Sequence, residues 1–370
     1  MLEYEGCYQL RTRLVMATLS GRSVRIRNIR SDEDFPGLKE FEANLIRLFD
    51  KLTNGSKFEV SETGTALTYH PGLLTGGSFV HETCPLRGIG YYMEPLLLLG
   101  LFCKNPLEVT FKGVTNHPSD PSPDLIRSSA LPVLKKFLLI DHGIEIKIQK
   151  RGAYPKGGGQ VLFKLPIRKS IRSIQSVDQG KIKRIRGVAW ATRVSPAVSN
   201  RLVEAAKSVC LKFIPDVYFN TDHLTGKKSG ASPGFGIVLQ AETTTGSVLT
   251  VEVTSNPGES NTPTVPEDLG IEGAHALLEE IFRGGAIDSN SQTLAILLMA
   301  LSQRDVSKIV TGPLSDYTVH FLRHLRDFFQ ITFKLETFED EDSSELQMGA
   351  DKVMLTCVGT GFTNIAKRTT

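Results

Sequence analysis

The stretch Lys150-Arg-Gly-Ala-Tyr-Pro-Lys-Gly-Gly-Gly-Gln160 contains three consecutive glycines between two cationic side chains. Glycine lets the backbone bend freely and approach a phosphate closely. Arg151 and Lys156 make the same loop positively charged. Strand-like patterns at residues 144–149 and 160–166 lie on either side. Taken alone, the loop is typical of either an anion-binding turn or a glycine-rich hairpin with incidental charge.

A proline-rich loop lies upstream and leads into a helical pattern. It reads Gly113-Val-Thr-Asn-His-Pro-Ser-Asp-Pro-Ser-Pro-Asp-Leu-Ile-Arg127. In kind, order and spacing, the two loops resemble the RNA 3′-terminal phosphate cyclase family. Members of that family carry a Gly-Gly-Thr-Asp-Asn-Pro type loop followed by a Gly-Phe-Tyr-Pro-Lys-Gly-Gly-Gly type hairpin. The resemblance extends over nearly the whole chain, with a short C-terminal extension outside it.

The composition is typical of a globular protein. Of the 370 residues, 40% are hydrophobic and 22% are charged, and no apolar run is long enough to cross a bilayer. The N-terminus lacks the basic and apolar regions of a secretory signal. The five cysteines have no Cys-x-x-Cys spacing, which predicts a reducing intracellular compartment and no zinc site.

Positive charge gathers in a basic stripe at residues 164–186. This stripe holds eight Lys or Arg residues and a single acid, Asp178, although the net charge of the chain is only +3. Such a stripe is typical of a surface that contacts phosphates, and equally of a solvated linker. The sequence leaves both interpretations open.

Hydrophobic periodicity reveals a repeated order of helix, strand, helix, strand, strand. The first copy covers residues 8–70 and the second covers residues 90–166. A third copy does not follow directly, because the same pattern returns only at residues 291–358. The residues between show a strand, a helix, a strand, a hairpin and a helix, which indicates a small inserted unit.

We therefore expect an α+β protein whose large domain has three repeated units, each with two helices and a four-stranded sheet. The cyclase resemblance implies the same architecture, with a small inserted α/β domain of thioredoxin-like topology. The expected division is 1–183 for the first two repeats, 184–284 for the insert, and 285–370 for the third repeat and a C-terminal extension.

The resemblance also implies a chemistry for which this chain lacks the nucleophile. In the family, a histidine carries an ATP-derived adenylate and passes it to an RNA 3′-phosphate, which requires a nitrogen nucleophile and a phosphate cradle. Asp316 occupies that position within Gly312-Pro-Leu-Ser-Asp316. A carboxylate would give a more hydrolysable acyl-adenylate. His320 and His324 follow at a spacing that permits metal binding or simply places two histidines on a helix surface.

Three further departures from the family disfavour ATP binding. Tyr8, within Glu5-Gly-Cys-Tyr-Gln9, puts a ring where the family's Glu-Gly-Gly-Gly-Gln motif has only backbone. Acids at residues 32–34 replace a basic stretch, and Glu94 stands where the family has a glutamine. The chain is therefore predicted to have no cyclase activity, no cofactor and no metal.

These departures resemble a cyclase-like branch of the family found in eukaryotes. The resemblance implies a nucleolar factor of small-subunit ribosome biogenesis that is required for early pre-rRNA cleavages. It implies three kinds of partner: a large processome GTPase that recruits the protein, pre-rRNA, and snoRNP components of the small-subunit processome. Three alternatives stay open: an endoribonuclease acting on pre-rRNA, an active cyclase with an unusual nucleophile, and a pure scaffold.

Four cations are predicted to hold an RNA phosphate, or an acidic partner segment, in one cleft. They are Arg11, Arg127, Arg151 and Lys156. A second group on one helix is a candidate surface for the GTPase, or an ordinary solvated face. It consists of Arg323, Arg326 and Asp327.

A nuclease would need either converging carboxylates or a general acid–base set. The candidate carboxylates are Asp120, Asp124, Glu5 and Glu94. The candidates for metal-free cleavage are His117, Arg127, Arg151 and Lys156. In the purely structural interpretation, Asp120 caps the following helix and pairs with Arg127. Trp190 is expected in the core of the insert, and the basic loop at 227–236 is either a contact surface or without function.

Overall fold

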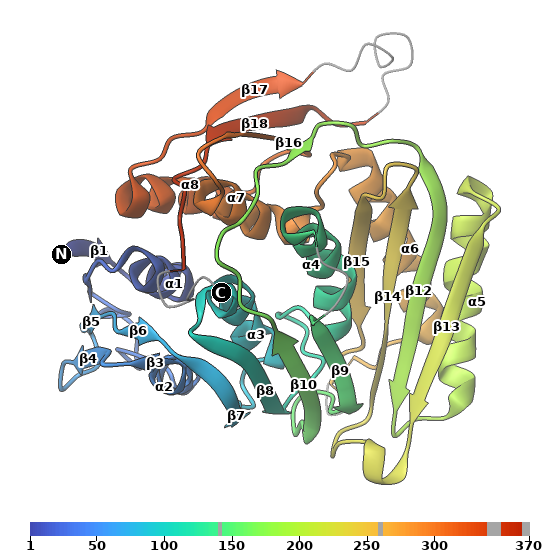
Figure 1. Ribbon diagram of the computed structural model, residues 1–370. Coiled ribbons are helices and arrows are strands. Elements are labelled where there is room, and N and C mark those ends of the chain that lie inside the picture. Colours follow the sequence, from blue (N-terminus) through green and yellow to red (C-terminus); the bar gives the residue numbers. More distant parts are fainter. Residues whose placement is uncertain (140–142, 258–261, 339–348, 365–370) are drawn as a thin grey trace.

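The computed structural model describes residues 1–139, 143–257, 262–338 and 349–364. These residues form four four-stranded sheets, three in the large domain and one in the insert (Figure 1). The first unit has the strand order β1-β2-β5-β4. Its elements are β1 (Leu2–Glu5), α1 (Leu10–Ser20), β2 (Val24–Arg27), α2 (Glu40–Leu52), β4 (Lys57–Val60) and β5 (Leu67–His70). A short ladder of β3 (Thr53–Asn54) and β6 (Leu73–Leu74) precedes the second unit.

The second and third units repeat this arrangement, with orders β7-β8-β10-β9 and β11-β16-β18-β17. The second unit comprises β7 (Gly76–Glu82), α3 (Ile89–Leu99), a 3₁₀ turn η1 (Gly100–Phe102), β8 (Asn105–Gly113), α4 (Pro123–Leu138), β9 (Glu145–Lys150) and β10 (Gly159–Leu165). The third comprises β11 (Gln175–Ser176), α7 (Gln292–Leu301), β16 (Val306–Thr311), α8 (Asp316–Phe329), β17 (Lys334–Phe338) and β18 (Lys352–Val358).

The expected α+β fold of three two-helix units is confirmed, and each unit has a leading strand that the periodicity did not reveal. β1, β7 and β11 each pair in parallel with the second strand of their sheet. β7 lacks a clear alternation of apolar residues and β11 has only two residues, whereas β1 alternates as Leu-Glu-Tyr-Glu but is only four residues long. Because β11 lies before the insert, the third unit begins there rather than near residue 285, and the insert separates β11 from α7.

The insert is a β-α-β-β-β-α unit with strand order β13-β12-β14-β15. β12 pairs in parallel with β13 and antiparallel with β14, as a thioredoxin-like topology requires. Its elements are β12 (Ile182–Thr192), α5 (Pro196–Phe213), β13 (Val217–Leu224), the 3₁₀ turn η2 (Gly226–Lys228), β14 (Gly234–Thr243), β15 (Val248–Thr254) and α6 (Pro266–Arg283). A 3₁₀ turn, η3 (Ser289–Ser291), then leads into α7.

Two separate apolar cores support the site. The larger core joins all three repeats, with members such as Phe49, Phe111 and Phe321, whereas the insert has its own core around Leu202 and Leu277. Helices α1, α3 and α7 are buried on nearly all sides, which is why their sequences have little polar–apolar asymmetry. Trp190 is 2% exposed, which confirms its predicted place in the interior. Among the described residues, no helix has the length and apolarity needed to span a membrane.

Candidate functional site

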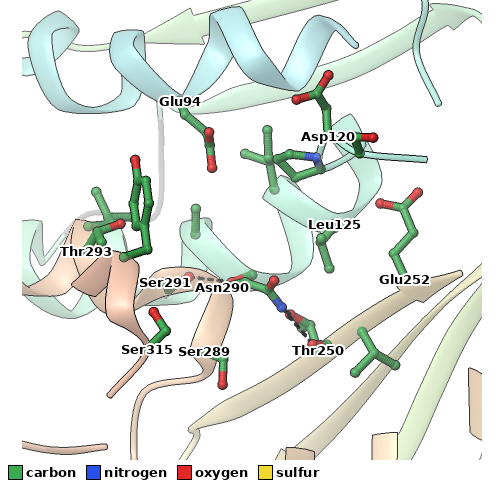
Figure 2. Close-up of a pocket in the computed structure, with 18 of the residues that line it drawn as sticks. Glu94, Asp120, Leu125, Thr250, Glu252, Ser289, Asn290, Ser291, Thr293 and Ser315 are labelled. Carbon is green, nitrogen blue, oxygen red and sulfur yellow. Dashed lines mark hydrogen bonds between the residues drawn. The ribbon is translucent and has the colours of Figure 1, made fainter. Parts of the chain in front are cut away.

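A cavity of about 700 Å³ lies where the helices of the three repeats face the insert. Its walls come from α1, α3, α4, η3, the start of α8, and from β15 and α6 of the insert. Figure 2 shows the carboxylates of Glu94, Asp120 and Glu252 along the upper and right sides, with Ser289, Asn290 and Ser315 below. Of the four cations predicted to form a phosphate cradle, Arg11 alone is among the residues that line this cavity.

Arg11 is already neutralised by a carboxylate. Its Nη2 lies 2.5 Å from Oε2 of Glu94, and its Nη1 donates to the carbonyl of Tyr91 at 3.0 Å. Burial disfavours the guanidinium charge, but the Glu94 carboxylate outweighs it and holds the pKa of Arg11 above its usual value. The Glu94 carboxylate therefore compensates the charge of Arg11 directly.

Arg151 is 1% exposed and holds the insert against the large domain. Its Nη1 lies 2.7 Å from Oδ2 of Asp124 on α4, and its Nη2 lies 2.7 Å from Oδ2 of Asp222 on β13. The guanidinium also donates to Oδ1 of Asn116 and lies 5.6 Å from the ring centre of Trp190. Burial opposes the charge, but the two carboxylates hold the pKa of Arg151 above its usual value.

Arg127 and Lys156 lie away from the cavity. Nη2 of Arg127 donates to Oδ1 of Asp124 at 3.0 Å, while 45% of its side chain is exposed. Asp120 instead pairs with Arg87, and Ser122 caps α4 by accepting from Leu125, so the predicted Asp120 cap with an Arg127 pair is wrong. Lys156 is an exposed residue whose backbone N–H donates to Oγ of Ser232 in the insert.

The three glycines at residues 157–159, in the loop that begins at Lys150, pack against the insert. The carbonyl of Gly157 accepts from the N–H of Ala231, and a Cβ added to Gly230 would lie only 2.1 Å from that carbonyl. The N–H of Arg151 donates to the carbonyl of Lys228 in the same basic loop. The close backbone approach that glycine permits is thus used between two segments of the chain. The only sign of this packing in the sequence was Gly230, a glycine in the basic loop at residues 227–236.

Asp316 begins α8 at an exposed position, after the cap Ser315, whose Oγ accepts from Thr318. His320 packs edge-on against the ring of Tyr8, whereas His324 is buried and its Nε2 accepts from Nε of Arg13. Burial and the neighbouring Arg13 lower the pKa of His324 to about 4. The two histidines therefore have separate surroundings, and no group of three potential metal ligands occurs among the described residues.

The candidate partner surface on α8 divides into inward and outward residues. Oδ2 of Asp327 accepts from the hydroxyl of Tyr4, and its carbonyl accepts from Arg22. These bonds connect the first repeat with the third. Arg323 and Arg326 are exposed.

Sequence reasoning missed the acidic wall contributed by the insert. Glu252 on β15 accepts from Nδ2 of Asn116 and from the N–H of Ser122. Burial raises the pKa of Glu252 to about 7, although those hydrogen bonds counteract it. Asp288, which caps η3 and is not among the residues that line the cavity, is also buried, and burial raises its pKa to about 6. Only tertiary structure brings β15 against α4, so no local pattern marked these carboxylates.

His117 lines the same cavity as Glu252. Its Nδ1 accepts from the N–H of Ser119, and its ring packs edge-on against Tyr154. Burial lowers the pKa of His117, although Asp120 opposes this effect. A histidine and a carboxyl group whose pKa is raised to about 7 therefore face one cavity.

Comparison with known proteins places this geometry in one family. The RNA 3′-terminal phosphate cyclase family matches residues 2–335. The RNA 3′-terminal phosphate cyclase-like protein of Homo sapiens is 55% identical over 366 residues, which cover 99% of this chain and 97% of the human one. An rRNA processing protein of Schizosaccharomyces pombe is 41% identical over 368 residues, with 99% and 97% coverage. This chain therefore belongs to the RNA 3′-terminal phosphate cyclase family, among its cyclase-like members.

Proposed function

We propose that this protein is a pre-rRNA processing factor of the small-subunit processome and that it lacks cyclase activity. The observation that carries the proposal is the similarity, over 99% of this chain, to the fission yeast rRNA processing protein. The cavity supports the second part, because Arg11 is paired with Glu94. The family resemblance puts Asp316 at the nucleophile position, next to the cavity residues Ser315 and Tyr317. A triphosphate entering the cavity would meet carboxylates whose charge repels it.

Labelled ATP tests the loss of cyclase chemistry. Purified protein is incubated with α-labelled ATP, separated under denaturing conditions and scanned for attached AMP, beside an active cyclase as the positive control. We expect no label on the wild type. We also expect none on Asp316→His, because Tyr8 and the Arg11–Glu94 pair remain in place. Label on the wild type contradicts the proposal, whereas label on Asp316→His alone would show that the aspartate by itself prevents adenylation.

Depletion in cells tests the pathway. Loss of the protein should cause precursors of the small-subunit rRNA to accumulate, and a tagged copy should localise to the nucleolus. Hybridisation to pre-rRNA spacers reports the cleavages that fail. Normal precursor levels after complete depletion would remove the proposal.

We infer that the GTPase partner binds the outward face of α8. Arg323 and Arg326 are exposed there, with Nε of Arg326 3.9 Å from Oδ1 of Asp327. Asp327 itself bonds to Tyr4 and is excluded. Arg323→Glu with Arg326→Glu should abolish co-purification of the processome GTPase. Lys212→Glu, at an exposed position in the last turn of α5, is the matched control. Equal recovery with both proteins would place the partner on another face.

Direct cleavage of pre-rRNA is the second candidate, favoured by His117 and Glu252 lining the same cavity. Metal-free cleavage needs a base for the 2′-hydroxyl and an acid for the leaving oxygen, and these groups have suitable chemistry. Purified protein should then cut a pre-rRNA fragment at one position in the presence of EDTA. His117→Gln should abolish the cut. Uncut RNA leaves the factor without nuclease activity.

A further inference from the structure

A second hollow, of about 720 Å³, lies where all three parts of the chain meet. Its walls come from the end of α4, from residues 172–178 of the basic stripe, and from Thr245 in the hairpin of the insert. Gln303 and Asp305 of the third unit complete it. We call this hollow the linker groove, and it shares no lining residue with the central cavity.

Lys136 contributes a partly buried ammonium group to the linker groove. Its Nζ donates to Oγ of Ser247 at 3.0 Å and to Oγ of Ser176 at 3.3 Å. Within the described ranges, no carboxylate lies within ion-pair distance of this group. Burial lowers the pKa of Lys136 accordingly. A desolvated cation held only by hydroxyls gains free energy from an incoming anion, and the ammonium has a third donor available for one.

Arg172 adds an exposed guanidinium to the same groove. It has no ion-pair partner in the described part of the chain. Other members of the basic stripe differ, since Lys164 pairs with Glu108 and Arg184 pairs with Glu242. Lys181 flanks the groove, because its backbone N–H donates to Thr244, the neighbour of Thr245. The stripe therefore contains both paired cations and cations available to a ligand.

Two acids also line the linker groove, but both accept internal hydrogen bonds. Oδ1 of Asp178 accepts from the N–H of Gly180 at 2.7 Å. Asp305 accepts from Oγ of Ser173 and from the N–H of Val306, and these bonds hold its pKa below the usual value. Lys136 and Arg172 bring two positive charges to the lining, and Asp178 and Asp305 bring two negative ones, so the formal charges cancel and the two cations attract an anion only locally. The groove therefore suits one or two consecutive phosphates of a strand whose remaining phosphates lie outside it.

We propose that the linker groove binds the phosphate backbone of single-stranded RNA, with Lys136 and Arg172 as the phosphate contacts. The choice of RNA as the anion rests on the proposed function. Among the described residues, no aromatic side chain lines the groove, so the contacts recognise charge and not base sequence. Since α4, the linker and the insert hairpin all meet at Lys136, bound RNA would contact three parts of the chain at once.

Fluorescence anisotropy with a labelled single-stranded RNA of about 16 nucleotides tests the proposal in full-length protein. Arg172→Gln and Lys136→Gln should each weaken binding about three- to tenfold, uniformly across RNA sequences. The double variant should reduce the slope of log affinity against log salt by about 1.4, because each lost phosphate contact removes about 0.7. Lys212→Gln, a lysine in the last turn of another helix, should leave affinity and slope unchanged.

Arg172 is exposed, so its variant tests the groove even if Lys136→Gln destabilises the fold. Unchanged affinity and slope in Arg172→Gln overturn the proposal. The proposal is also overturned if the protein binds a polyglutamate peptide at the groove while neither substitution changes its affinity for RNA. Failure of this proposal can be told apart from failure of the proposed function. If Arg172→Gln binds RNA normally and also restores pre-rRNA cleavage in depleted cells, RNA binding at the groove is excluded. The role in pre-rRNA processing then still stands.

Discussion

The central cavity and the linker groove have nearly equal volumes, about 700 and 720 Å³, yet their cations have opposite surroundings. In the cavity, Arg11 is paired with Glu94, and Arg151 nearby lies between two carboxylates. In the groove, Lys136 contacts only hydroxyls. The comparison teaches that the partners of a basic residue, and not its presence in a motif, decide whether it can bind an anion.

The difference also separates two roles of positive charge. A buried arginine between carboxylates is a structural connection, because removing it leaves anions without compensation. An ammonium among hydroxyls keeps its affinity for a phosphate. Arg151, in the glycine-rich loop at residues 150–160, thus connects the insert with the large domain. The cations available to a ligand lie outside that loop, in the linker groove.

Substitution of Arg151 should have the largest effect on stability. Arg151→Met leaves Asp124 and Asp222 facing a nonpolar side chain in the domain junction, which should lower the free energy of unfolding by about 3–5 kcal/mol. Denaturant unfolding at pH 7 measures this difference. Adding Asp222→Asn should recover part of the loss, since it removes one stranded charge. A loss below about 1 kcal/mol would mean that Arg151 does not join the domains.

The acidic wall of the cavity should make stability depend on pH. The folded-state pKa of Glu252 is about 7, above the ordinary value of 4.5, so its neutral form stabilises the fold and this contribution is lost as pH rises through 7. Between pH 5 and pH 8, the wild type should lose about 2–3 kcal/mol more than Glu252→Gln. Asp288 titrates in the same direction in both proteins, so their difference isolates Glu252. Parallel curves would contradict the prediction.

Removing the charge of Glu94 should make the cavity able to bind an anion, as we propose for the linker groove. Glu94→Gln keeps the side-chain size and leaves Arg11 without its carboxylate. Calorimetric titration with ADP should then show an affinity at least about tenfold above the wild type, a gain of about 1.4 kcal/mol. Arg11→Gln combined with Glu94→Gln should cancel the gain. An equal affinity in all three proteins would show that the Arg11–Glu94 pair does not control anion binding.

The repeats and the insert were predictable because their helices and strands carry the expected periodicity. The exceptions have physical causes. β11 pairs through only two residues, Gln175 and Ser176, whose partners lie beyond the insert. A strand of that length has no hydrophobic pattern to detect. β11 is defined by its pairing with β16, far away in the sequence, and not by its own residues.

The candidate site was less predictable, because it depends on which charges meet. The sequence indicated Glu94 as a departure from the family but could not pair it with Arg11, which lies in another repeat. It likewise could not place Asp222 of the insert beside Arg151. The same glycines that suggest a phosphate loop also allow backbone packing against Gly230. Composition alone does not distinguish these uses.

Substitution of Arg127 should have the smallest effect on stability and on RNA affinity, and it tests the contrast between paired and unpaired cations. It shares Asp124 with Arg151 but leaves 45% of its side chain in solvent, where water screens the pair. Arg127→Gln should change the free energy of unfolding by less than about 1 kcal/mol, because Arg151 still compensates Asp124. Its RNA affinity should stay within about twofold of the wild type, since one exposed and paired cation contributes little. A loss comparable to that of Arg172→Gln would mean that a carboxylate partner does not prevent a cation from contacting phosphate, which would remove the distinction between cavity and groove.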